Sequence, residues 1–216
     1  MQINSLPGEL FIWTNVEHEY EADMNHWYES EHLRERVLIP GFRWARRYCS
    51  RQGPRRYLAL YRTDALDVFS SPAYQFAFRN QTEWSQQVFT RMRDTMRRVC
   101  SVPHVGGVGT GQGGILLELP PNLSHDLQGQ LLSNLGKLAG VAGFHWLEPV
   151  AELSTPLPGG DFGNLSPMVF ADVLQPEAHA QVISMLRNLD LGASTQVHAF
   201  DFMREVRAAD LVQAPH

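Results

Sequence analysis

A short segment near the N-terminus combines the residue types that general acid–base catalysis uses. Trp27, Tyr28, Glu31 and His32 lie within one stretch of six residues. On a helix, a spacing of four places Tyr28 and His32 on one face, with the other two side chains beside them. Imidazole exchanges a proton near neutral pH, and a nearby carboxylate or phenol can assist it. The segment therefore predicts His32, Tyr28 and Glu31 as a catalytic set. Trp27 would form the apolar wall of a substrate site.

The same segment also fits a role without chemistry. An amphipathic helix that covers a sheet would bury Trp27 and Tyr28 simply by packing them against the strands. Spacing alone favours this packing interpretation. The catalytic interpretation requires, in addition, that His32 points into a pocket.

Arginines follow on the next predicted strand. Side chains alternate along a strand, so Arg43 and Arg47 are expected to share one face. The opposite face would carry Phe42, Trp44 and Arg46. Arg47 could bind a carboxylate or enolate of a substrate through two parallel hydrogen bonds. It could equally pair with a glutamate of the helical layer, and the sequence leaves both interpretations open.

The composition is that of an ordinary globular protein. Hydrophobic residues make up 44% and charged residues 19% of the 216 residues, which excludes a disordered chain. No apolar run approaches the roughly 20 residues of a membrane helix. The first residues lack the basic region and apolar core of a signal peptide. We therefore expect a cytoplasmic protein without a membrane partner.

Cysteine and histidine patterns give no sign of a metal site. Cys49 and Cys100 have neither metal-ligand spacing nor the number that a disulfide framework needs. The nine histidines form no close pair on one helix or strand face of the kind that binds zinc. We expect neither a metal nor an organic cofactor.

Positive charge is concentrated in the first half, which holds fourteen of the eighteen basic residues. Arg91, Arg93, Arg97 and Arg98 form its densest group. We expect them on the solvated face of an amphipathic helix or against the acidic second half. Because the first half carries a net charge of only +2, nucleic-acid binding is not expected.

The first half alternates between strand and helix patterns. Apolar residues at three- and four-residue steps predict a helix that stops at Pro40-Gly41. Thr82 is expected to cap the last helix of a broken helical region. The predicted elements are a strand at 10–16, a helix at 23–38, a hairpin of strands at 42–48 and 57–62, helical residues from 64 to about 99, and a strand at 102–105.

A glycine-rich stretch separates the two halves. Gly109, Gly111 and Gly114 match the register GxGxxG, which in a dinucleotide site lies between a strand and a helix. Here a strand pattern at 115–119 follows directly. The stretch at 106–114 is therefore predicted to be a flexible joint and not a nucleotide site.

The second half repeats the order of the first. Gly41-Phe-Arg-Trp44 and Gly143-Phe-His-Trp146 lie 102 residues apart, each between a first helix and a second strand. Ser124 is expected to cap the first helix of this half. The predicted elements are strands at 115–119, 143–148, 168–173 and 197–206, helices at 124–138 and 176–189, and a loop at 155–160.

These patterns predict an α+β fold of two tandem ferredoxin-like β-α-β-β-α-β repeats. Residues 1–106 would form the first repeat and residues 113–210 the second. An antiparallel sheet with helices on one face leaves its other face open, and two such sheets can bury these faces against each other. The chain is thus expected to form a fused dimeric α+β barrel. A homodimer of the whole chain is left open.

Residues 8–105 resemble bacterial proteins of the dimeric α+β barrel superfamily, in particular the EthD-like proteins named for ether degradation. The motifs that carry the resemblance are Asn25-His-Trp-Tyr-Glu-Ser-Glu-His-Leu-Arg-Glu35, Ile39-Pro-Gly-Phe42, Arg46-Arg-Tyr48, Tyr57-Leu-Ala-Leu-Tyr61 and Ser71-Pro-Ala-Tyr74.

The resemblance implies a pocket between the sheet and the helices of one repeat, with His32 facing it and Trp27 and Tyr28 lining it. The superfamily includes polyketide cyclases, cofactor-free monooxygenases, lactone isomerases and lyases. The matching helix of the second repeat, Gln128–Asn134, has no Trp, Tyr or His. The first repeat is therefore the candidate active repeat, and the second is degenerate.

Some relatives with two fused repeats, the chlorite dismutase-like group, bind haem through a histidine of the second repeat. His145, His179 and His198 are candidates for that role by residue type alone, and the motifs of that group are absent from the sequence. Haem is therefore not expected.

The sequence thus predicts a cofactor-independent enzyme that acts on a small molecule. Proton-transfer chemistry of the lyase, isomerase or cyclase type, on an aromatic or polyketide-like compound, fits the candidate residues. Two alternatives remain open: a cofactor-free monooxygenase, and a non-catalytic protein that binds a small ligand or serves as a structural oligomer.

Overall fold

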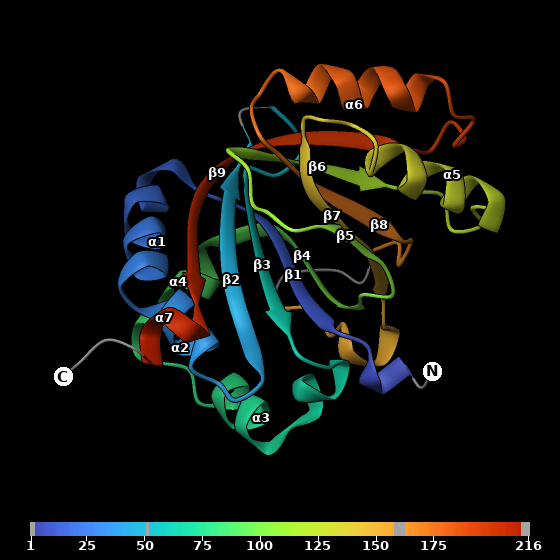
Figure 1. Cartoon of the computed structure of the whole chain (residues 1–216). Coiled ribbons are helices and arrows are strands. Elements are labelled where there is room, and N and C mark those ends of the chain that lie inside the picture. Colours follow the sequence, from blue (N-terminus) through green and yellow to red (C-terminus); the bar gives the residue numbers. More distant parts are fainter. Residues whose placement is uncertain (1–2, 51, 158–162, 213–216) are drawn as a thin grey trace.

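Antiparallel strands form one sheet that closes on itself (Figure 1). The computed structural model describes residues 3–50, 52–157 and 163–212. In this part of the chain the strand order is β4-β1-β3-β2-β9-β6-β8-β7-β5, and β4 also pairs with β7. The β4–β7 pairing joins the two ends of the row, so eight strands make a closed barrel and β5 is a short addition beside β7.

The strand order repeats within the barrel. The first four long strands run β4-β1-β3-β2, and the last four run β9-β6-β8-β7, which is the same ferredoxin-like order. The seams between the two sets are β2–β9 and β4–β7. The predicted fold is therefore confirmed. The strands are β1 Gly8–Val16, β2 Phe42–Cys49, β3 Tyr57–Thr63, β4 Met92–Ser101, β5 Val105–Gly107, β6 Gly113–Glu118, β7 Val141–Pro149, β8 Met168–Val173 and β9 Gln196–Arg207.

Helices cover the outside of the barrel on opposite sides (Figure 1). The side chains of Thr82 and Ser124 accept hydrogen bonds from the first turns of α4 and α5, as expected for their caps. The helices of the first repeat are α1 Glu21–Trp27, α2 Leu33–Val37, α3 Pro72–Arg79 and α4 Glu83–Arg91, those of the second are α5 His125–Leu135 and α6 Ala178–Arg187, and α7 Ala208–Val212 follows β9. Within the described residues, no helix is both long and apolar enough to span a membrane.

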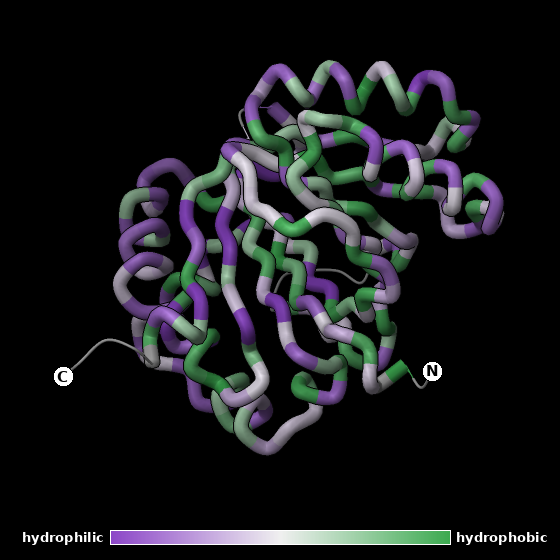
Figure 2. Tube along the Cα trace, in the orientation of Figure 1, coloured by the Kyte–Doolittle hydropathy of each residue, from purple (hydrophilic) through white to green (hydrophobic). Residues whose placement is uncertain are grey.

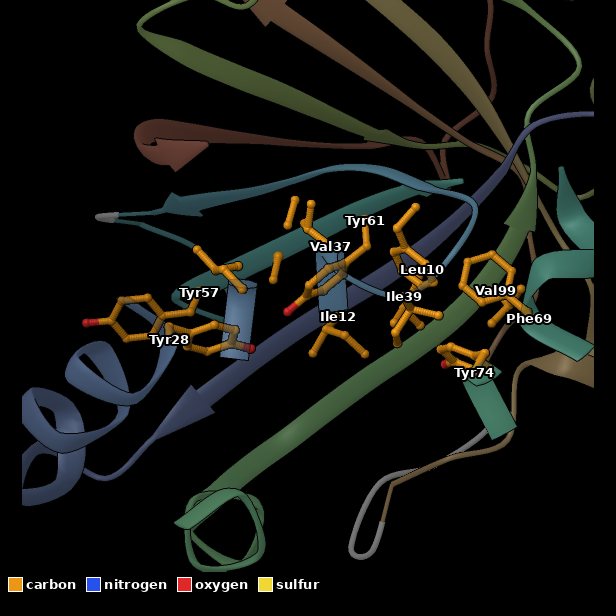
Figure 3. Packing of buried hydrophobic residues seen from close by; sticks show 14 of the residues in the cluster. Leu10, Ile12, Tyr28, Val37, Ile39, Tyr57, Tyr61, Phe69, Tyr74 and Val99 are labelled. Carbon is orange, nitrogen blue, oxygen red and sulfur yellow. The ribbon is translucent and has the colours of Figure 1, made fainter. Parts of the chain in front are cut away.

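Hydrophobic residues form three cores. One lies between the first four strands and their helices (Figure 3), and a second lies under α5 and α6. The third fills the barrel and takes residues from both repeats, among them Phe11, Trp13, Phe170 and Phe200. Hydrophilic and hydrophobic residues alternate along α1 and α6, as expected for helices with one face on a core (Figure 2). The inner faces of the two sheets therefore bury each other.

The predicted boundary of the last strand in the first repeat is wrong. The sequence predicts a helix to about residue 99, but α4 ends at Arg91 and β4 begins at Met92. Within β4 the side chains alternate: Arg97 lies on the helix side, opposite Ile12, and Arg98 lies on the barrel side, opposite Phe11. The expected basic helix face is thus a strand with two buried arginines.

The glycine-rich stretch is packed against the barrel and does not form a free joint. The amide groups of Val108 and Gly109 both donate to the carbonyl of Ala142. A Cβ atom at Gly106 would come within 2.3 Å of the Phe144 ring. These glycines therefore allow close backbone contact with β7. The proposed repeat limits, 1–106 and 113–210, stay predictions, and residues 158–160 of the predicted loop lie outside the described residues.

A buried ion cluster links the two repeats. The carboxylate of Glu9, on β1, accepts from Arg62 Nη2 at 2.6 Å and lies 2.9 Å from Nε2 of His145, on β7. Burial alone would raise the pKa of Glu9, but His145 and Arg62 lower it to about 2. Glu9 is thus ionised in the folded chain at every pH above about 2.

This cluster predicts how stability depends on pH. Because the pKa of Glu9 is lower in the folded than in the unfolded chain, it stabilises the fold above about pH 4.5, and this contribution of about 3 kcal/mol is lost as the pH falls toward 2. Replacing Glu9→Gln should lower the free energy of unfolding by about 3–5 kcal/mol at neutral pH. Denaturant titrations over a pH series test this. The exposed Glu19→Gln is the control, and equal stability of both variants would contradict the prediction.

Candidate functional site

A cavity of about 380 Å³ lies between the sheet of the first repeat and its helices. Its walls are mostly apolar and aromatic, with a few polar groups, as is usual for small-molecule sites. The lining residues are Leu10, Ile12, Tyr28, His32, Arg36, Tyr61, Tyr74, Phe78, Gln81, Phe89, Met92, Arg97, Thr155, Pro156 and Leu157. The last three come from the segment between β7 and β8, so the second half of the chain forms part of the wall.

The predicted catalytic segment forms a π-helical turn, Tyr28–His32, between α1 and α2. In an α-helix, at about 3.6 residues per turn, side chains five positions apart diverge by about 140°. The wider π-turn brings such residues together. The rings of Trp27 and His32 accordingly stack with their centres 4.0 Å apart. This turn aims His32 at the cavity while Trp27 lies behind it.

His32 is almost fully buried among aromatic rings. Tyr28, Tyr61 and Phe89 meet its ring edge-on, and Trp27 stacks on it. Neither ring nitrogen bonds to a described residue, and Nδ1 is fully covered. Burial holds the pKa of His32 well below its ordinary value, and the charges of Arg36 and Arg47 lower it further. At neutral pH the imidazole is therefore uncharged and can accept a proton.

Two phenols lie beside this imidazole. Figure 3 shows the hydroxyl ends of Tyr28 and Tyr61 directed toward one another. The two hydroxyl groups also interact with each other. Burial raises the pKa of both groups, well above the usual range for Tyr61, and this contact lowers the pKa of Tyr28 and raises that of Tyr61. Both phenols therefore stay protonated at neutral pH and can donate a hydrogen bond to a ligand.

Two buried arginines complete the polar part of the wall. Arg36 Nη2 donates to the Ala77 carbonyl at 3.4 Å and to Gln81 Oε1 at 3.3 Å. Arg97 Nη2 donates to the Tyr74 hydroxyl at 3.1 Å, and its Nη1 donates to two backbone carbonyls of the second repeat. Two covered polar atoms of the lining, His32 Nδ1 and Arg36 Nε, have no hydrogen-bond partner among the described residues. Such atoms are rare in folded proteins, so their presence in one wall supports this cavity as the candidate site.

The structure does not bring Glu31 to the cavity. Its carboxylate accepts from Thr82 Oγ1 at 2.6 Å and Ser85 Oγ at 3.3 Å, where α4 begins. Ser85 Oγ in turn accepts from the indole of Trp27 at 3.1 Å. This chain of bonds fixes Trp27, which stacks on His32, so Glu31 reaches the imidazole only through two intermediaries.

Arg47 also lies outside the cavity wall. Its guanidinium stacks 3.9 Å from the centre of the Tyr28 ring and donates to Asn25 Oδ1 at 2.9 Å. Burial lowers the pKa of Arg47, and the neighbouring tyrosines oppose that effect. Arg47 therefore supports Tyr28 from the far side.

One detail of the predicted strand faces is wrong. The sequence places Phe42 opposite Arg47, but Phe42 lies on the helix side, in the same core as Ala45. A register shift between Phe42 and Trp44 reverses the alternation at that point. Arg43, at the bulge, is exposed and pairs with Asp64.

Sequence reasoning missed Arg36, Tyr61 and Arg97 as site residues. Arg36 is four positions after His32, a helical spacing that could have found it. Arg97 was missed because the sequence predicted a helix there, whereas the strand β4 directs Arg97 toward the cavity. No signal in the sequence connects Thr155–Leu157 to the first repeat.

Two of the three candidate histidines of the second repeat are bonded to carboxylates. His145 Nε2 bonds to Glu9 and His198 Nε2 bonds to Glu118, each at 2.9 Å. His179 Nε2 is covered, close to Gly113 of β6. The space under α5 and α6 is filled by a hydrophobic core. His179 and His198 also line a second hollow, of about 540 Å³, beside β9. In the described ranges, no three potential ligands gather in a metal-binding group.

The burial of His32 makes its charge testable. At about pH 5.5, roughly one unit below the ordinary imidazole pKa, His32 should still be neutral in the folded chain. Because the unfolded chain takes up this proton and the folded chain does not, stability should fall as the pH drops below about 6.5. NMR of the ring nitrogens measures the charge. His32→Gln should weaken the pH dependence, and the exposed His26→Gln should not. A His32 signal that titrates like free imidazole would contradict the assignment.

Comparisons with known proteins identify the fold. No protein-family model matches the sequence, and no curated protein sequence matches it. Solved structures with a similar fold include the following three. A candidate monooxygenase from Fusobacterium nucleatum subsp. nucleatum gives a TM-score of 0.64 over 94% of this chain and 95% of its own, at 7% identity. An anthrone oxidase-like protein gives 0.58 over 94% of each chain at 10% identity.

The third structure is a chlorite dismutase variant from Candidatus Nitrospira defluvii, with a TM-score of 0.51 over 90% of each chain at 10% identity. The TM-scores and coverages establish a common fold, whereas sequence identities this low leave the reaction open. Together with the strand order, they place this chain among proteins with the dimeric α+β barrel fold.

Proposed function

We propose that this chain is a small-molecule enzyme that needs no organic cofactor, and that its reaction begins with proton transfer from the substrate to His32. One observation carries the proposal: an uncharged imidazole, without a hydrogen-bond partner in the described chain, lines an apolar cavity. Perturbed titratable groups in cavities are a common mark of active sites. The expectation of His32 as acid–base group is thus retained.

The cavity walls favour a planar aromatic substrate. Aromatic rings of Tyr28, Tyr61, Phe78 and Phe89 line the space, and offset or edge-on ring contacts would hold a flat ligand. A volume of about 380 Å³ lies near the lower end of small-molecule pockets. A compound of one to three fused rings is the size that we expect.

The candidate residues have different roles in this proposal. His32 takes the proton, and the phenol of Tyr28 donates a hydrogen bond where charge develops. Trp27 fixes the plane of the imidazole by stacking, and Glu31 holds Trp27 through Ser85. Arg47 supports Tyr28 from behind. Glu31, Trp27 and Arg47 are therefore positioning residues.

Proton abstraction is the shared first step of lyases, isomerases and cyclases that act beside a carbonyl or phenol, which are the activities implied by the EthD-like resemblance. A second candidate is a cofactor-free monooxygenase, in which the deprotonated substrate reacts with dioxygen. The names of two similar structures, the candidate monooxygenase and the anthrone oxidase-like protein, favour testing it.

Exchange of substrate hydrogen in D₂O tests the proposal before the product is known. Wild-type protein should speed the loss of an acidic C–H signal from at least one enolisable aryl ketone or polycyclic anthrone in a panel followed by proton NMR. His32→Gln should slow this exchange by about 10²–10⁴-fold, because it removes the proton acceptor. His26→Gln, on the exposed face of the same helix, should leave the rate unchanged.

An oxygen electrode run on the same panel separates the two candidates. Oxygen uptake that depends on His32 identifies a monooxygenase, and exchange without uptake identifies a lyase, isomerase or cyclase. Ligand binding without any exchange would show a non-catalytic binding protein and would overturn the proposal.

A further inference from the structure

Two buried arginines of the cavity wall form no ion pair with a carboxylate of the described residues. Arg36 and Arg97 are 5% and 4% exposed, and both line the cavity. All hydrogen-bond acceptors that they contact in the described chain are neutral: backbone carbonyls, the Gln81 amide and the Tyr74 hydroxyl. A buried charge held this way is costly unless something neutralises it.

Two buried arginines inside the barrel do form ion pairs. The buried Arg62 forms an ion pair with Glu9, and the buried Arg46 forms one with Asp172. The fold thus provides carboxylates for these arginines of the barrel interior. Arg36 and Arg97 have no such ion pair among the described residues, and neither does Arg47, which instead bonds to Asn25 and stacks on Tyr28 behind the cavity wall.

The other titratable groups around the cavity do not supply the missing charge. His32 is neutral, and Tyr28 and Tyr61 stay protonated because burial raises the pKa of both phenols. No Asp or Glu is among the lining residues that the structure describes. Glu31 is bonded to Thr82 and Ser85.

Glu35, the remaining acid on this helix, is partly exposed and has no hydrogen bond or ion pair to a described residue. Burial and the charge of Glu31 raise its pKa, while Arg36 lowers it. It does not line the cavity. The anion that these two arginines would bind must therefore come from outside the described chain.

We propose that the substrate is an aromatic compound that ionises on oxygen, a phenol or an enolisable ketone, and that the cavity binds it as a phenolate or enolate beside Arg36 and Arg97. When the O–H or C–H bond breaks, its electron pair stays on the ligand, where the charge rests on oxygen, and the proton passes to His32. This inference names the substrate class and rests on the proposed function for the reaction, but binding alone can test it.

The proton acceptor, His32, and the two arginines of the anion site would act together. His32 is a weak base because it is buried and lies near the positive charges of Arg36 and Arg47. An oxyanion formed beside it would favour its protonated form, and Arg36 and Arg97 would stabilise that oxyanion. Proton transfer is thus favoured only for a ligand that develops negative charge, which selects against neutral aromatic compounds of the same shape.

A coloured phenol measures the effect directly. The phenolate form of para-nitrophenol is yellow, so its absorbance gives the fraction ionised during a pH titration with excess protein. Binding to the wild-type protein should lower the apparent pKa of the phenol by about 1–3 pH units, as expected beside a buried cation. Arg36→Gln and Arg97→Gln should each remove part of this shift. Arg34→Gln, on the exposed face of α2, is the matched control and should keep it whole.

Para-nitroanisole, which has the same ring but no acidic hydrogen, should bind more weakly than para-nitrophenol, and Arg36→Gln should not weaken it further. If circular dichroism shows that either arginine variant is unfolded, the titration with the wild-type protein alone decides whether the inference holds. An unchanged phenol pKa, equal affinity for the two compounds, or no binding of the phenol would each overturn the inference. Hydrogen exchange that depends on His32, with an unchanged phenol pKa, would leave the proposed function standing while this inference fails.

Discussion

The mutual burial of two sheet faces is the constraint on which the rest of this structure depends. Each set of four strands has a face that its own helices do not cover, and these faces meet in a core that neither repeat could form alone. Because Phe11 and Trp13 from one repeat pack with Phe170 and Phe200 from the other, the inside of the barrel is filled. The outer faces, between strands and helices, differ between the two repeats. A hydrophobic core lies under α5 and α6, with a hollow of about 540 Å³ beside α6 and β9, whereas the first repeat holds the aromatic-lined cavity.

The fold was predictable from the sequence because it depends on patterns that local composition reveals. The repeated Gly-Phe-x-Trp motif and the alternation of strands and helices were enough to find the two ferredoxin-like units and their fused barrel. The prediction failed where one stretch fitted two patterns. Residues 92–99 fit the pattern of a basic amphipathic helix, but as part of β4 they pair with β1, and Cys100 and Ser101 at the end of the strand pair with β7. This tertiary pairing overrides the local preference.

The candidate site was predictable only in part, for a related reason. A spacing of four correctly grouped Tyr28 with His32, since both line the cavity, but α-helical geometry cannot predict the π-turn that stacks Trp27 on the imidazole. Glu31 and Arg47 have suitable chemistry for a site, yet they lie behind it, because neighbours on a helix or strand need not face the same space. Arg97 and Thr155–Leu157 line the cavity because residues far apart in the sequence are in contact there. Residue spacing along the sequence does not reveal such contacts.

The second half of the chain forms part of the cavity wall, although its matching helical segment, Gln128–Asn134, has no aromatic residue. The segment that follows β7 runs back over the first repeat, where Ser154 bonds to the backbone of Val99 in both directions. Arg97 holds the carbonyls of Leu153 and Thr155 from the same strand. The residues that close the cavity are thus fixed to β4 by a side chain that also carries the unpaired charge. In a symmetric dimer of identical chains, such a segment would serve both sites alike. Fusion removes that requirement, so one repeat can hold the cavity while the other supplies part of its wall.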